Sequence, residues 1–154
     1  MGPTNNLSYL VQHLAAVLGR QADQVLQEQL GIGLSQYKIL LMLEWNSQLQ
    51  QKAIAESLGQ TEASISRQLK LMQTRRLITV KRDAANKRKH IIAPTTLGMQ
   101  MTEAASNSMR RSFGPEFASI GDDQLMQLLS GLQRLHAIVC QPGKTGACDH
   151  PLGL

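Results

Sequence analysis

The chain has 154 residues and a net charge of +5, and 42% of its residues are hydrophobic but only 3% aromatic. This length fits one domain, or one domain with a dimerisation extension, and a core of Leu, Ala, Ile and Met favours packed helices over a large sheet. The sequence contains neither an apolar run near the roughly 20 residues of a membrane span nor a secretory signal pattern. We therefore expect a cytoplasmic protein that does not enter a membrane.

The first two predicted helices occupy residues 6–30 and 35–45. Apolar side chains recur at helical spacing in both segments, and Asn5 or Asn6, and then Ser35, stand where N-caps are expected. Gly31 and Gly33 are expected to end the first helix. That helix is longer than a small domain needs, so its apolar stripe is suited to packing on a second copy of the chain.

A short helix over residues 51–58 and a longer one over 61–74 are expected next. Gly59 supplies a left-handed residue between them, and Thr61 caps the longer helix. The longer helix has one apolar face. Its opposite face is small and polar near the start and cationic further on, which is the layout of a DNA recognition helix.

Short β-prone runs at residues 77–81 and 91–92, joined by a polar and basic link, predict a hairpin with a charged tip that stops at Pro94. Two long helices follow. The first is capped by Thr95 or Thr96 and runs to about residue 113, where a Gly-Pro pair interrupts it. The second is capped by Asp122, and its leucine stripe between 125 and 139 suits dimerisation.

Positive charge is concentrated between Arg67 and His90, a stretch with nine of the chain's 16 lysines and arginines and one of its 11 acids. Such an excess on a helix and a projecting loop is typical of a surface for a nucleic-acid backbone. The fold class is therefore mainly α (α+β), a winged helix-turn-helix with long flanking dimerisation helices. The expected division is a dimerisation helix (residues 1–34), a DNA-binding domain (35–95), further dimerisation helices (96–140) and a flexible tail (141–154).

In this order the elements resemble the MarR family of bacterial transcriptional regulators over roughly residues 7–138. The resemblance rests on G-L-S-Q-Y-K-I-L at 33–40, Q-K-A-I-A-E-S-L-G at 51–59, S-I-S-R-Q-L-K at 64–70, and a wing signature of Leu77-Ile78, Arg82, Asp83, Asn86, Arg88 and Thr95-x-x-Gly98. Three positions depart from the family pattern: Arg76 replaces a usual Gly, Asn86 a usual Asp, and Pro94 a common Leu.

The resemblance implies a homodimer that binds a pseudo-palindromic site on double-stranded DNA and regulates transcription, with repression as the leading role. Neither enzymatic activity nor a cofactor is expected. The candidate DNA-binding residues are Thr61, Ala63, Ser64, Ser66, Arg67, Gln68, Lys70, Arg82, Lys87, Arg88 and Lys89. Those between 63 and 68 are expected near bases, and the lysines and Arg88 near phosphates. Arg75, Arg76 and Arg82 suit either DNA contact or the solvated base of the hairpin.

The resemblance also implies that a small-molecule effector shifts the spacing of the recognition helices. The candidate pocket residues are His13, Val17, Tyr37 and Met42, for which core packing is the alternative role. Cys140 and Cys148 raise a further alternative, a redox-responsive regulator that forms a disulfide. They have neither C-x-x-C spacing nor a neighbouring Cys/His set, so no metal site is expected.

Three other classes are weaker interpretations of the sequence. A winged-helix protein–protein interaction module would show little salt-dependent DNA binding. An enzyme would need paired carboxylates, a nucleophile with its base, or a phosphate-cradling loop, and none emerges. RNA binding usually requires exposed aromatic platforms, which this chain lacks.

Overall fold

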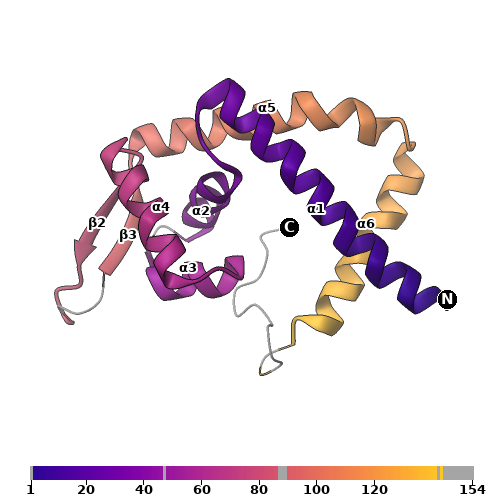
Figure 1. Ribbon diagram of the computed structural model, residues 1–154, viewed down its shortest axis with the longest axis horizontal. Helices are drawn as coiled ribbons and strands as arrows, with labels where there is room; N and C mark the ends of the chain where they lie inside the picture. Colours follow the sequence, from indigo (N-terminus) through magenta and orange to yellow (C-terminus); the bar gives the residue numbers. More distant parts are fainter. Residues whose placement is uncertain (1, 47, 87–89, 142, 144–154) are drawn as a thin grey trace.

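The computed structural model describes residues 2–46, 48–86, 90–141 and 143, and this part of the chain folds into helices and one small sheet (Figure 1). The elements are α1 (Pro3–Leu30), α2 (Leu34–Trp45), β1 (Leu49–Gln50), α3 (Gln51–Leu58), α4 (Glu62–Thr74), β2 (Ile78–Arg82), β3 (His90–Pro94), α5 (Thr96–Ala118) and α6 (Asp122–Val139). Within the described residues, no helix combines the length and the apolar character needed to cross a lipid bilayer.

One hydrophobic core joins α2, α3, α4 and the sheet to the C-terminal end of α1 and the first half of α5. Its fully buried members come from all of these elements and include Leu26, Ile32, Ile39, Leu40, Leu43, Ile54, Ile65, Met72, Leu77, Ile92 and Ala105. Because these apolar side chains leave water together, the recognition-helix region and the end of α1 form one packed unit.

The sheet has three antiparallel strands in the order β1-β3-β2. Val80 of β2 stands opposite Ile92 of β3, and Arg82 stands opposite His90. The hairpin is therefore as predicted, although β3 is longer than the sequence indicated. The edge strand β1, which pairs Leu49 with Ile92, was not predicted. Two residues carry no periodicity, so only a long-range pairing defines such a strand.

The predicted terminators and caps around the helix-turn-helix are confirmed. Gly31 and Gly59 end their helices in the left-handed region, with φ of 64° and 61°. The Thr61 side chain accepts a hydrogen bond from the Ser64 amide and so caps α4.

The starts of the first two helices differ from the prediction. α1 begins at Pro3, ahead of Asn5 and Asn6, because a proline in the first turn has no backbone N–H that needs a partner. α2 follows the N-cap Gly33 rather than Ser35. None of the three predicted residues therefore caps a helix.

The expected interruption of α5 is wrong, because α5 runs through Pro115 to Ala118. A proline removes one helical hydrogen bond, here to the carbonyl of residue 111, and that residue is exposed so that water can replace the lost donor. The last helix begins at Asp122 itself, after Gly121, whose φ is 90°. Asp122 thus lies in the first turn and is not the N-cap.

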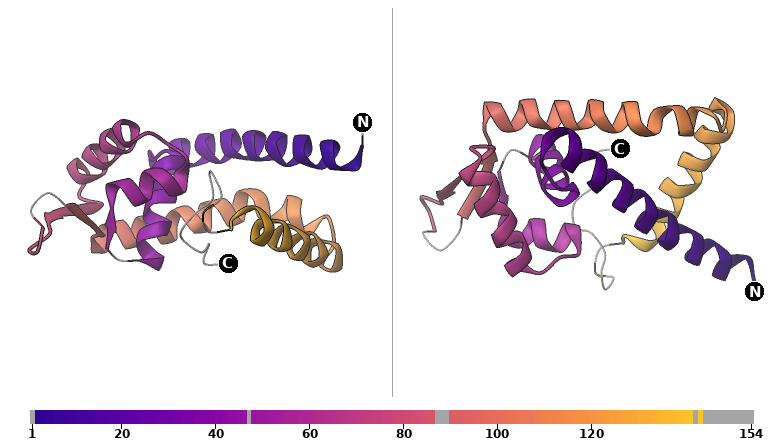
Figure 2. Two further views of the ribbon diagram at one scale, coloured as in Figure 1. Left: turned by 90° about the horizontal axis from the view of Figure 1, so that it is seen from below. Right: turned by 45° about the horizontal axis from the view of Figure 1, so that its top comes forward.

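The N-terminal half of α1 and all of α6 extend away from the core. The two helices cross in Figure 1, but the left view of Figure 2 shows them at different levels, α1 above α6. No residue of α6 is buried, although the helix carries many apolar side chains. An amphipathic helix in this condition has an apolar face without a partner among the described residues.

A tight junction connects the hairpin to α5. The Thr95 hydroxyl donates to the carbonyl oxygen of Arg76 (2.6 Å) and lies 3.1 Å from that of Leu77, while its oxygen accepts from the Gly98 amide (3.0 Å). A β-carbon on Gly98 would lie 2.0 Å from the carbonyl oxygen of Leu77. Only glycine therefore allows α5 to approach the start of the wing this closely.

We predict that Gly98→Ala lowers the free energy of unfolding by about 1–3 kcal/mol or more, because the backbone must move to relieve the overlap. Urea unfolding at one fixed protein concentration measures this change. Gly114→Ala in the same helix is the matched control, since a β-carbon there meets no atom within 4 Å. An unchanged midpoint for Gly98→Ala would contradict the close approach.

Candidate nucleic-acid interface

α3, Gly59 and α4 form a helix-turn-helix whose packing decides which side of α4 faces outward. Ile65, Leu69 and Met72 recur at helical spacing on α4, and all three are buried against the core. Burial of this face fixes the rotation of the helix, and so leaves the opposite face in solvent.

The outward face of α4 carries the small and cationic residues that the sequence predicted there. Ala63, Arg67 and Lys70 are exposed, and Ser66 is half-buried between them. Within the described residues, neither Arg67 nor Lys70 forms an ion pair, and the ion pair that is found joins Lys52 to Glu56 on α3 (3.8 Å). The charges on α4 are therefore available to an external anion.

Two other predicted DNA contacts of α4 are held by the protein itself. The Ser64 hydroxyl donates to Gln60 Oε1 (3.3 Å). Gln68 Oε1 accepts from Gln36 Nε2 of α2 (3.0 Å), and both residues are at least half-buried. Gln36 and Gln60 were not singled out from the sequence, because bonds between distant segments leave no local pattern.

The wing carries the rest of the predicted cationic surface. Arg82 is exposed at the end of β2, opposite the exposed His90, and the Ala85 amide donates to Asp83 Oδ1 (2.9 Å) in a turn beyond it. Lys87, Arg88 and Lys89, the predicted phosphate contacts at the tip, lie outside the described residues.

The two arginines after α4 differ sharply. The Arg75 guanidinium donates to the carbonyl oxygens of Gly31 (2.5 Å) and Leu30 (3.3 Å) at the end of α1. Arg76 is exposed and has a φ of 57°, a left-handed conformation that costs a non-glycine residue roughly 1 kcal/mol. This conformation explains why the family pattern favours glycine at this position.

The four predicted effector residues lie in different surroundings. His13 is exposed and stacks on Tyr9, with ring centroids 5.8 Å apart, whereas Tyr37 and Met42 pack against the core. Val17 is half-buried on α1.

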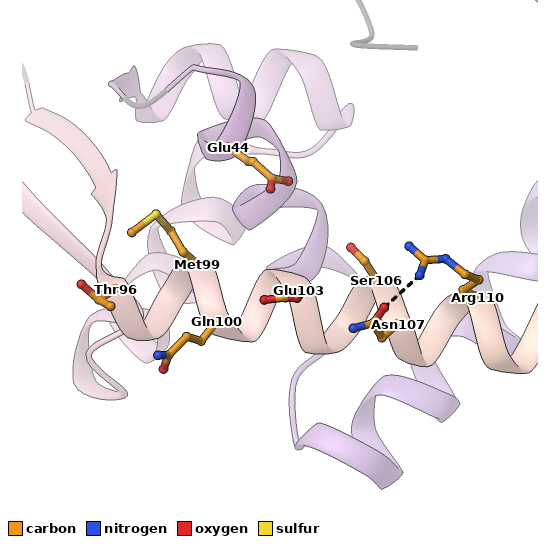
Figure 3. Close-up of a pocket in the computed structure, with 8 residues that line it drawn as sticks. All are labelled: Glu44, Thr96, Met99, Gln100, Glu103, Ser106, Asn107 and Arg110. Carbon is orange, nitrogen blue, oxygen red and sulfur yellow. Dashed lines mark hydrogen bonds between the residues drawn. The ribbon is translucent and has the colours of Figure 1, made fainter.

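A separate open pocket of about 610 Å³ lies between α2 and α5 (Figure 3). Its lining is Glu44, Thr96, Met99, Gln100, Glu103, Ser106, Asn107 and Arg110.

That pocket is connected to one predicted effector residue. The Tyr37 hydroxyl and the Ser106 hydroxyl are 2.9 Å apart, so a hydrogen bond joins α2 to the pocket wall on α5. Arg110 donates to Asn107 on the same wall (3.0 Å). The lining mixes both signs of charge with a methionine. No local sequence pattern marks this pocket, because one wall comes from another helix.

One of the two cysteines, Cys140, lies among the described residues. Cys140 is half-buried at the C-terminal end of α6, where its amide donates to the His136 carbonyl (2.8 Å). Cys148 lies outside the described residues, so a disulfide between them stays a prediction. In the described part of the chain, no group of three or more His, Cys, Asp or Glu side chains could hold a metal ion.

The helix-turn-helix, the hairpin beside it and the exposed cationic face together define a winged helix-turn-helix protein. Residues 30–89 match the model of the MarR family. In this stretch the chain is similar to the MarR family, and solved MarR-family regulators share its fold.

Several solved structures have the same fold. The Staphylococcus aureus MepR–DNA complex is 26% identical, with a TM-score of 0.70 over 85% of this chain and 96% of that one. BldR from Sulfolobus solfataricus is 18% identical, with a TM-score of 0.78 over 90% of this chain and 100% of that one. At that identity the likeness shows the fold alone. No curated protein matches the chain by sequence.

We predict that Thr61→Ala lowers the free energy of unfolding by about 1 kcal/mol, because the Ser64 amide loses its capping acceptor. Thr61→Asp keeps an acceptor and should retain most of that stability. Thermal unfolding at fixed concentration compares the three proteins. If Thr61→Ala is as stable as the parent, the cap contributes nothing and the hydroxyl is free to serve DNA.

Proposed function

We propose that the protein is a homodimeric repressor that binds a pseudo-palindromic operator in the cytoplasm. Each copy lays α4 in the major groove, and each wing lies along the backbone or in the minor groove. The observation that carries this proposal is the outward face of α4, where Arg67 and Lys70 are exposed and without ion pairs in the described part of the chain. MepR, a relative of the same fold, has been solved in complex with DNA.

The dimer is supported by apolar surface that the described part of the chain leaves uncovered. On α6, the exposed fraction is 64% for Met126, 51% for Leu128 and 59% for Ile138. On α1, Leu10 and Leu14 are also about half exposed. The alternative role for these stripes was packing of α1 on α6 within one chain, whereas the left view of Figure 2 shows the two helices at different levels. A second copy is the partner that covers this surface and supplies two-fold symmetry.

The separation between the cationic surface of α4 and the apolar surface of α1 and α6 supports the proposed domain boundaries. The winged region of residues 35–95 would contact DNA, while residues 1–34 and 96–140 would hold the dimer together. A small-molecule effector that releases the operator stays a prediction from the resemblance. The pocket between α2 and α5 is where we expect it, because the Tyr37–Ser106 bond links that pocket to the winged region. Redox control through Cys140 and Cys148 remains the alternative.

Dimer formation should depend on the apolar side chains of α6. Leu128→Glu combined with Leu132→Glu should yield monomers at micromolar concentration, because burial of two carboxylates in an apolar interface is strongly unfavourable. Light scattering gives the mass, and circular dichroism checks that the helices remain. Gln124→Glu with Gln127→Glu adds the same charge to exposed positions of α6 and serves as the control. A parent mass of 16.9 kDa, that of one chain, would refute the dimer.

The second prediction concerns DNA. Fluorescence anisotropy should show preferential binding to the duplex upstream of the protein's own gene over a scrambled duplex, with a steep salt dependence. Arg67→Ala should weaken specific binding by about 1–3 kcal/mol, and Lys70→Ala should reduce the salt slope by about 1.

Arg111→Ala is the matched control, since this exposed arginine lies in the C-terminal half of α5, whose N-terminal end joins the wing. It should leave both quantities unchanged. Equal weak binding to both duplexes would contradict a sequence-specific regulator and favour the protein–protein interaction module.

A further inference from the structure

The recognition helix α4 is tied along its length to the junction between α1 and α2, defined here as residues 30–36. Gln60, just before α4, donates to the Ser35 hydroxyl (2.6 Å). In the middle of the helix, Gln68 accepts from Gln36 (3.0 Å). At the far end, Arg75 donates to the carbonyl oxygens of Gly31 and Leu30. Three side-chain contacts therefore fix α4 against one short segment.

The contact at Arg75 differs from the other two because it reaches α1. Leu30 is the last residue of α1, and Gly31 is its C-cap. Among the side-chain hydrogen bonds found in the described residues, those of Arg75 are the ones that join α1 to the end of α4. Since α1 carries the exposed stripe of the proposed dimer, this contact lies between the dimer surface and the recognition helix.

The chemistry of the contact favours a fixed orientation of α4 relative to α1. The last carbonyls of a helix lack intrahelical donors and carry the negative end of the helix dipole. A guanidinium is planar and always charged, so it can bond two such carbonyls at once in a defined orientation. These two carbonyl groups engage two of the five N–H donors of the exposed Arg75 side chain.

We propose that Arg75 is a positioning residue that fixes the direction of α4 relative to α1, and thereby sets the separation of the two recognition helices in the dimer. Its charge interacts with the carbonyl groups at the end of α1 and not with DNA. The proposal rests on the dimeric DNA-binding function proposed above. The two half-sites must meet both copies of α4 one helical turn apart. Weaker attachment of α4 to α1 therefore reduces the discrimination between operators of different half-site spacing.

Arg76 provides a matched control for Arg75. It has the same charge, follows directly in the chain and is exposed. Its side chain forms no hydrogen bond or ion pair within the described residues, and only its backbone takes part in the junction with Thr95. Replacement of either arginine by methionine removes one charge and keeps a long, flexible side chain, so a general charge effect would appear in both variants.

The first experiment measures the distance between α1 and α4 within one chain. Spin labels on Gln21→Cys of α1 and Gln73→Cys of α4, with both native cysteines replaced by serine, report the distance between the helices by pulsed electron paramagnetic resonance. Dilution with unlabelled protein leaves one labelled chain in each dimer. We expect a broader distance distribution for Arg75→Met, partial recovery for Arg75→Lys, and the parent distribution for Arg76→Met. An unchanged distribution for Arg75→Met would overturn the proposal.

The second experiment measures the consequence on DNA by anisotropy, with operators whose half-sites are moved by one base pair in either direction. Arg75→Met should bind the natural spacing about tenfold more weakly, should discriminate less among spacings, and should keep the parent salt slope. A slope reduced by about 1 with an unchanged spin-label distribution would identify Arg75 as a phosphate contact and overturn the proposal. If the parent itself shows no specific binding, the proposed function fails, while the spin-label result still decides the role of Arg75.

Discussion

Burial of the apolar face of α4 is the constraint on which the rest of the structure depends. Ile65, Leu69 and Met72 are drawn into the core with residues of α2, α3 and the sheet. Since these three residues lie on one side of a helix, their burial determines which residues face outward. The positions left in solvent carry Arg67 and Lys70, so the same hydrophobic contact that stabilises the domain also presents its cationic surface.

The remaining structure follows from what this core leaves uncovered. The wing lies beside α4 because β2 continues directly from the end of that helix, and Gly98 permits α5 to return close to the start of the wing. α5 then carries the chain away from the core to α6, which has no buried residue. One end of the molecule is thus cationic and the other apolar, which fits a protein that binds DNA at one end and its own copy at the other.

Much of this organisation was predictable from the sequence, because helices and turns leave local signals. Apolar spacing located the helices, and Gly31, Gly59 and Thr61 marked their ends correctly. The strand β1 and the bonds of Gln36 and Arg75 were not predictable in the same way, since each depends on a segment distant in the chain. The error at Pro115 has another cause: an exposed proline near a helix end removes only one hydrogen bond, and water can replace it.

The most direct test of the proposed dimer on DNA is methylation interference on the preferred duplex. Methylation of guanine N7 blocks contacts in the major groove, which is where α4 should lie. Two recognition helices on one duplex should give two clusters of interfering guanines on one face, about 10 base pairs apart between half-site centres. A single cluster, or binding that is indifferent to guanine N7 methylation, would contradict the placement of two recognition helices in successive major grooves.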